Sequence, residues 1–208
     1  MTDTSLKNNN NTENNMNIIN IASWNMKSFK NNSSFVENQL QSCEIILLQE
    51  TWLHHFEENL IHNFHPDFLG TSVSSMPSGT LIRGRPYGGT AILLKKTLST
   101  AVTEIDLQDS RLSGIMFKYD ENKCLIINAY LPTSDNPDDQ SDYIGKLTSI
   151  IENSDADSFI IGGDFNICPG SQKFEEMSKS FEECGMDILD IQIQDGDTFL
   201  FQEVRGKI

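Results

Sequence analysis

The chain has 208 residues, 38% of them hydrophobic, and a formal net charge of −15. This length is enough for one substantial domain, and the acidic balance excludes a protein that holds nucleic acid simply through a basic surface, because that affinity comes from Lys and Arg on phosphates. It does not exclude an enzyme that acts on phosphate groups, since a metal ion can supply positive charge locally.

Residues 1–16 form an Asn-rich segment with almost nothing to bury, so we expect a disordered tail ahead of one domain over residues 17–208. The segment lacks the apolar stretch of a secretory signal. No run approaches the roughly 18 apolar residues of a membrane span. We therefore expect no membrane partner and no secretion. The expected location is intracellular, and nuclear if the protein acts on genomic DNA.

The order of the predicted elements indicates a mixed α/β protein. Apolar runs and alternation predict strands over residues 18–25, 44–50, 88–94, 101–105, 111–119, 123–131 and 159–164. Helices are expected over residues 33–41, 141–153 and 172–184, with a helix or irregular turn over 53–64. Because strands and helices do not alternate strictly, this order favours an α/β sandwich with antiparallel and mixed sheets over a doubly wound parallel sheet.

The four cysteines and four histidines give no convincing metal site. The cysteines are widely scattered without a C-x-x-C pair, which favours buried free thiols over zinc ligands. The histidines all fall within residues 54–65, where a chance cluster on a solvated helix is the simpler interpretation. Basic residues are also grouped, with Arg83 and Arg85 in one Gly-rich loop.

The segment Gly163-Asp164-Phe165-Asn166 follows an apolar strand. In extended geometry Asp164 and Asn166 point to one face, and ligands of α/β sheets bind where strands end. A carboxylate there can bind Mg²⁺ or take a proton, and an amide can donate to a phosphate. Taken alone, the segment also fits an ordinary turn, since Asp and Asn favour turns and helix caps.

Polar residues end other predicted strands as well. Asn25 and Glu50 close two of them, and a third ends in Asn128-Ala129-Tyr130-Leu131-Pro132. If these ends converge, they form a site with two carboxylates, several carboxamides and a phenol. The chain has no P-loop and no apparent Ser-His-Asp arrangement. The set suits metal-assisted attack of water on a phosphoester.

Six motifs in this order make the chain recognisable: Trp24-Asn25, Leu48-Gln49-Glu50-Thr51, Gly88-Gly89-Thr90-Ala91, Arg111-Leu112, Asn128-Ala129-Tyr130-Leu131-Pro132 and Gly163-Asp164-Phe165-Asn166. The series resembles the endonuclease/exonuclease/phosphatase superfamily, and in particular the endonuclease domain of LINE-type non-LTR retrotransposons. The match spans roughly residues 17 to 200 and keeps the motif order, which makes it far more specific than any single motif.

The resemblance implies a four-layer α/β sandwich, with two mixed β-sheets packed face to face and helices outside. It implies a Mg²⁺-dependent DNA endonuclease, with Mn²⁺ as an alternative ion. Its partners would be target DNA and a reverse transcriptase encoded downstream. The alternatives are a catalytically inactive or binding module, or a phosphatase or phospholipase of the same superfamily.

The resemblance also assigns roles to individual residues. Glu50 is the chief metal ligand, with Asn25 beside the metal. Asp164 contacts the metal and orients or deprotonates the attacking water, and Asn166 contacts the scissile phosphate or a metal. Tyr130 donates to a phosphate oxygen. Arg111 matches a position that is often basic in retrotransposon relatives, and it is assigned to substrate binding.

Each assignment has a simpler alternative. Glu50 would cap a helix that starts near Thr51, Asn25 would form a turn, and Tyr130 would be a half-buried strand tyrosine. Arg111 would be a surface residue at a hairpin. Both tryptophans would belong to the core.

The chain departs from the family pattern near its end. The family's Ser-x-Ile-Asp and Ser-Asp-His motifs are absent, and no histidine follows His65. We expect a C-terminally truncated domain that is missing its last strands. Loss of the histidine predicts nicking slowed by about 10²–10⁴-fold.

Overall fold

The computed structural model describes residues 18–77, 84–133, 137–188 and 203–204, and the predicted tail over residues 1–16 lies outside this part. One sheet has the strand order β1-β2-β4-β3, with β1 Ile21–Asn25, β2 Ile45–Gln49, β3 Phe68–Val73 and β4 Thr90–Lys95. The other has the order β5-β6-β7-β8-β9, with β5 Val102–Ile105, β6 Leu112–Tyr119, β7 Asn122–Tyr130, β8 Ser158–Asp164 and β9 Glu203–Val204. Both sheets are mixed, because β1 pairs with β2 and β7 pairs with β8 in parallel, whereas the remaining pairs are antiparallel.

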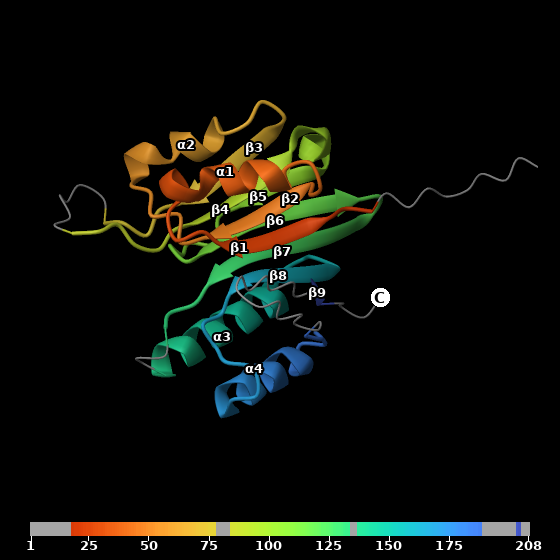
Figure 1. The fold of residues 1–208 in the computed structure, drawn as a ribbon. Coiled ribbons are helices and arrows are strands. Elements are labelled where there is room, and N and C mark those ends of the chain that lie inside the picture. The colour runs from red at the N-terminus through yellow and green to blue at the C-terminus, as the bar shows by residue number, and fades with distance from the viewer. Residues whose placement is uncertain (1–17, 78–83, 134–136, 189–202, 205–208) are drawn as a thin grey trace, which may run out of the picture.

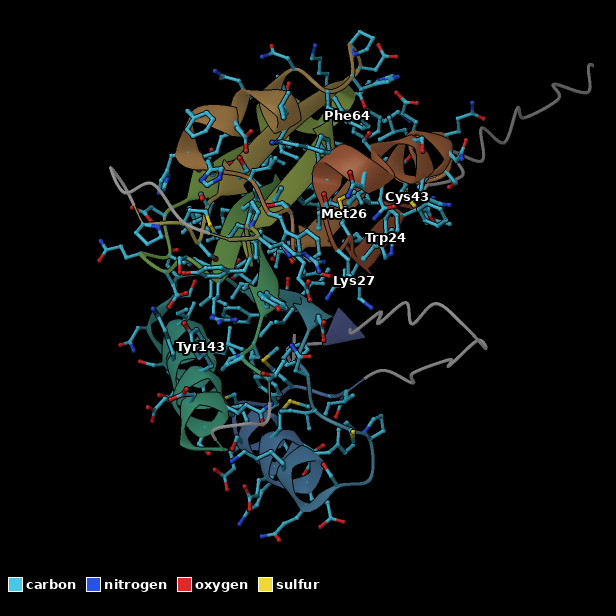
Figure 2. All side chains as sticks on the ribbon, turned by 60° about the vertical axis from the view of Figure 1, so that its left-hand side comes forward. Trp24, Met26, Lys27, Cys43, Phe64 and Tyr143 are labelled. Carbon is cyan, nitrogen blue, oxygen red and sulfur yellow. The ribbon has the colours of Figure 1, made fainter. Side chains whose placement is uncertain are left out.

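Helices cover the outer face of each sheet (Figure 1). On one side lie α1 Phe29–Gln39, α2 Asn59–His62 and the 3₁₀ turn η1 His55–Glu57. On the other lie α3 Pro137–Asn153 and α4 Gln172–Glu183. Another 3₁₀ turn, η2 Lys96–Ala101, connects the sheets between β4 and β5. Phe64 and Met26 accordingly lie in the layer of α1, and Tyr143 lies on α3 in the opposite layer (Figure 2). The predicted four-layer α/β sandwich is confirmed.

Three apolar clusters fill the spaces between these layers. One packs α1 and its neighbours on the first sheet through residues such as Val36 and Leu48. The second lies between the sheets and includes Leu47 and Ile126. The third packs α3 and α4 on the second sheet and includes Leu147. Residues that alternate along β2 and β7 thus serve different layers, as expected for strands buried on both faces.

A polar network also joins the two sheets. Gln49 Nε2 donates to Asn128 Oδ1 at 2.7 Å and to Ser23 Oγ at 3.0 Å. Asn128 Nδ2 donates to the carbonyl oxygens of Leu48 and Ala91, each at 2.9 Å. Asn128 is fully buried. The network therefore clamps β7 onto β2 and β4 and satisfies groups that water cannot reach.

The structure differs from the predicted elements in several places, including η2, which was not predicted, and α3, which begins at Pro137 rather than at residue 141. Strand β3 was not predicted, because its sequence FLGTSV shows no clear apolar alternation and only Phe68 is buried. Helix α1 begins at Phe29 rather than at residue 33, because the backbone N–H groups of Ser28 and Phe29 donate to the carbonyl oxygens of Glu50 and Thr51. Those long-range bonds satisfy the helix start in place of a side-chain cap.

Candidate active site

Four polar side chains, two from each sheet, meet at the ends of their strands. Asn25 ends β1, Glu50 follows β2 directly, Tyr130 ends β7 and Asp164 ends β8. Asn25 pairs in register with Gln49, and Tyr130 pairs with Asp164. Because each of these pairs is parallel, the carboxyl ends of its strands lie at the same sheet edge.

The amide of Asn25 joins the two carboxylates of the site. Its Nδ2 donates to Glu50 Oε1 at 2.7 Å and to Asp164 Oδ2 at 2.7 Å. Its Oδ1 accepts from the backbone N–H of Lys27 at 3.1 Å, which fixes the orientation of the amide. The Asn25 amide group thus lies between two like-charged groups, where its partial positive charge reduces their repulsion.

Tyr130 adds a neutral donor. Its hydroxyl donates to Glu50 Oε1 at 3.1 Å. Burial first, and then the nearby charge of Glu50, raises the pKa of Tyr130 to about 12. The hydroxyl therefore keeps its proton at neutral pH and remains a hydrogen-bond donor.

The backbone at Glu50 is held in an unusual conformation. Its φ is 52°, in the left-handed region that residues with a Cβ rarely adopt. The next residue, Thr51, is fixed by a hydrogen bond from its N–H to the carbonyl oxygen of Gly89 at 3.2 Å. A Cβ placed on Gly89 would lie 2.6 Å from Thr51 Oγ1, so this close approach requires glycine. The Glu50 carboxylate accepts from Asn25 and Tyr130, so it serves the site and not a helix cap.

Asn166 lies beside the site in a supporting position. Its N–H donates to Asp164 Oδ1 at 3.0 Å, and its Nδ2 donates to the carbonyl oxygen of Leu131 at 2.8 Å. Its own carbonyl accepts from Gln140 Nε2 at 3.0 Å, which links the loop to α3. The side-chain nitrogen that the sequence analysis assigned to a phosphate is thus engaged by the protein backbone.

Arg111 reaches the site through Tyr130. Its Nη1 lies 3.4 Å from the carbonyl oxygen of Tyr130, and its guanidinium carbon lies 5.2 Å from the centre of the tyrosine ring. The backbone N–H of Arg111 donates to Asp109 Oδ1 at 2.7 Å, and Asp109 Oδ2 accepts from Lys146 Nζ at 2.6 Å. The sequence did not indicate that Asp109 supports Arg111, because only the folded chain brings Lys146 of α3 to this loop.

The structure revises two other interpretations, of Asn128 and Trp52, and agrees with that of Trp24. Asn128 does not lie at an accessible strand end, because its side chain is buried between the sheets. Trp24 packs against Phe35 and the first apolar cluster, as expected for a core residue. Trp52 belongs to none of the three apolar clusters and instead lies under the guanidinium group of Arg85.

The donor set of this site suits a hard divalent cation. Among the described residues, no three His, Cys, Asp or Glu side chains gather as a metal-binding group. A cation would therefore be held by the carboxylates of Glu50 and Asp164, with the amide oxygen of Asn25 as a further ligand if that amide rotates. One or two carboxylates completed by water are typical of Mg²⁺ sites. In the same described ranges, no helix has the length and apolar character needed to cross a bilayer.

Solved structures share this fold. The endonuclease domain of TRAS1, a telomere-specific non-LTR retrotransposon, matches with a TM-score of 0.63 and 14% identity, over 83% of this chain and 75% of that one. An AP endonuclease from Archaeoglobus fulgidus matches with a TM-score of 0.59 and 16% identity, over 89% and 87% of the two chains. A 3′ phosphatase from Neisseria bound to a product DNA hairpin gives the same four values.

None of the curated proteins compared with this chain matches it. A family model described as the endonuclease/exonuclease/phosphatase family does match, over residues 22–205. This range includes Asn25, Glu50, Tyr130 and Asp164. The chain therefore belongs to the endonuclease/exonuclease/phosphatase family.

Proposed function

We propose that this chain is a Mg²⁺-dependent phosphodiesterase that nicks DNA, in the manner of a retrotransposon endonuclease. The observation that carries the proposal is the site itself, where an amide holds two carboxylates together beside a protonated phenol. The DNA substrate is supported by the similar folds of an endonuclease domain from a retrotransposon, an AP endonuclease and a phosphatase bound to a DNA product. We also propose a nuclear location and a reverse transcriptase encoded downstream, and the likeness to the retrotransposon endonuclease domain supports both.

Each residue of the site has a distinct task in this proposal. Mg²⁺, or Mn²⁺ in its place, would neutralise the charge on the phosphate and lower the cost of attack by water. Glu50 and Asp164 hold that cation, and Asp164 also accepts the proton of the attacking water. Tyr130 donates its O–H to an oxygen of the scissile phosphate as negative charge develops there. Asn166 holds Asp164 in position through its N–H.

Plasmid nicking tests the proposal. We expect relaxed circles to form with Mg²⁺ or Mn²⁺, to be absent with EDTA, and to be lost in Asp164→Asn. Glu44→Gln is the matched control, because Glu44 is paired with Lys95 at the opposite end of β2. Nicking that survives EDTA, or that survives in Asp164→Asn, would contradict the assignment.

The rate provides a second test. The 208 residues contain no histidine beyond His65, and His55 Nε2 is bonded to the carbonyl oxygen of Met76 at 2.8 Å. We propose that a polypeptide of these 208 residues nicks slowly, and that an appended segment with Ser-x-Ile-Asp and Ser-Asp-His accelerates it by about 10²–10⁴-fold. Rapid nicking without the segment would assign the histidine's task to another group. No nicking in either form would favour an inactive module.

A further inference from the structure

The guanidinium group of Arg85 lies over the ring of Trp52. Its guanidinium carbon lies 3.7 Å from the centre of the ring, and its side chain is exposed whereas Trp52 is half-buried. This is a short cation–π contact, and tryptophan is the aromatic ring that binds cations best. A guanidinium group that covers a ring in this way can still offer N–H donors to a ligand.

The stack lies at the rim of the candidate active site. Trp52 comes two residues after Glu50, and its N–H donates to the carbonyl oxygen of Gly88 at 2.9 Å. A Cβ placed on Gly88 would lie 3.9 Å from Tyr130 Cε1. The loop that carries Arg85 is therefore fixed between the Glu50 segment and Tyr130.

The backbone at Trp52 supports a role beyond packing. Its φ is 54°, a left-handed value that is a genuine outlier for a bulky side chain. Residues held in such conformations cluster at active sites and ligand clamps. The conformation presents the ring toward Arg85 instead of toward an apolar cluster.

Arg85 also differs from the basic residues of this acidic chain that are held in ion pairs. Lys30, Lys95, Lys123 and Lys146 each pair with a carboxylate. Across the described part of the chain, no carboxylate lies within ion-pair distance of Arg85. An exposed arginine without an acidic partner, oriented by a ring, suits bidentate binding of phosphate oxygens.

We propose that Arg85 binds a phosphodiester group of the substrate strand next to the scissile phosphate, and that Trp52 is its positioning residue. This inference rests on the proposed function and specifies how the strand is held. The ligand is the phosphodiester backbone, which both DNA and RNA supply.

Binding and its salt dependence test the proposal. A fluorescent DNA duplex is titrated with the protein in Ca²⁺ over a series of salt concentrations, and fluorescence anisotropy gives the affinity. We expect Arg85→Ala to weaken binding by about three- to tenfold and to lower the slope of log K against log salt by about 0.9, which is the loss of one phosphate contact on duplex DNA. Lys179→Ala is the charge-matched control, because Lys179 is exposed on α4. It should leave both quantities unchanged.

Two further variants separate charge from orientation. Arg85→Lys should restore the salt slope but not the full affinity, since lysine lacks the planar fork. Trp52→Ala should weaken binding while Trp52→Phe largely restores it, because a ring still supports the guanidinium group. The same titration with an RNA duplex of equal sequence shows whether the clamp accepts both backbones or only DNA.

The outcomes distinguish the two proposals. If neither nucleic acid binds, the proposed function fails and this inference fails with it. If DNA binds but Arg85→Ala matches Lys179→Ala in slope and affinity, only the Arg85 clamp is overturned. If Trp52→Phe binds no better than Trp52→Ala while both remain folded, the role of Trp52 is overturned.

Discussion

Asn25 and Asn128 both lie near the carboxyl end of a strand, and each joins the two sheets through hydrogen bonds. Asn128 is fully buried, and its Nδ2 donates to two backbone carbonyl oxygens. Asn25 is only partly buried, and its Nδ2 donates to two carboxylates. The same side chain therefore completes a neutral clamp in one place and joins a pair of charges in the other.

The two asparagines therefore contribute differently to the stability of the protein. A neutral network that is fully satisfied stabilises the sandwich, because removing any member leaves buried groups unpaired. The site around Asn25 instead holds like charges together beside residues in left-handed conformations, which is unfavourable without a ligand. Stability experiments should separate the two regions, and metal binding should affect only the second.

Asn128→Ala should have the largest effect on stability. It removes the buried hydrogen bonds from Asn128 Nδ2 to the Leu48 and Ala91 carbonyl oxygens and from Gln49 Nε2 to Asn128 Oδ1, so we expect unfolding to become easier by about 3 kcal/mol in urea. Ser113→Ala is the matched control, because Ser113 is buried opposite Asn128 and its Oγ has no partner among the described groups. It should be neutral or stabilising. Similar losses in the two variants would contradict the assigned role of the clamp.

Glu50→Gln should change metal affinity more than stability. Removing one of two carboxylates lowers the charge of the site, so we expect Mn²⁺ affinity by calorimetry to fall at least tenfold, or about 1.4 kcal/mol. The free energy of unfolding without metal should remain within about 0.5 kcal/mol of the unmodified protein. Equal Mn²⁺ affinities for the two proteins would remove Glu50 from the metal site.

Asn25→Asp should connect stability to metal. It replaces the shared donor by a third carboxylate, so without metal we expect a loss of about 1 kcal/mol in the free energy of unfolding. Excess Mg²⁺ should reverse this loss, because the added oxygen is a metal ligand. Asn153→Asp adds the same charge at the end of α3 and should not respond to Mg²⁺. A loss that persists in Mg²⁺ would argue against a cation between these carboxylates.

Tyr130 should produce an effect that is visible only at alkaline pH and absent at neutral pH. Its folded-state pKa of about 12 lies above the unfolded value of about 10, so the folded state holds the proton more tightly. This contribution to stability is complete below pH about 10 and is lost as the pH rises toward 12. Tyr130→Phe should therefore lose less stability than the unmodified protein between about pH 9 and 11.5. Tyr119→Phe, at a ring that is 60% exposed, should follow the unmodified protein.

The strand ends of the site could be predicted because local sequence determines them. A run of apolar residues that stops at Glu50 or Asp164 marks both a buried strand and the place where polar groups become accessible. The layers were also predictable, since strands such as β2 are apolar on both faces. Motif order then identified the family, which the family model confirms.

Features that depend on long-range contacts could not be predicted. Strand β3 is recognisable only once β4 pairs with it. Nothing local distinguishes Asn128 from a site residue, because its partners on β2 and β4 are far away in sequence. The contact of Arg85 with Trp52 and the link from Asp109 to Lys146 likewise exist only in the folded chain.

The hydrogen bonds of Asn25 carry a consequence for synthesis in the cell. Asn25 and Asp164 are 139 positions apart, and Tyr130 and Glu50 are 80 apart. At the usual rate of translation, about 5–20 residues per second, Asp164 is made roughly 7–28 s after Asn25. During that interval the nascent chain carries Glu50 without its partner carboxylate. The candidate site is therefore complete only after the second sheet has been made and has closed on the first.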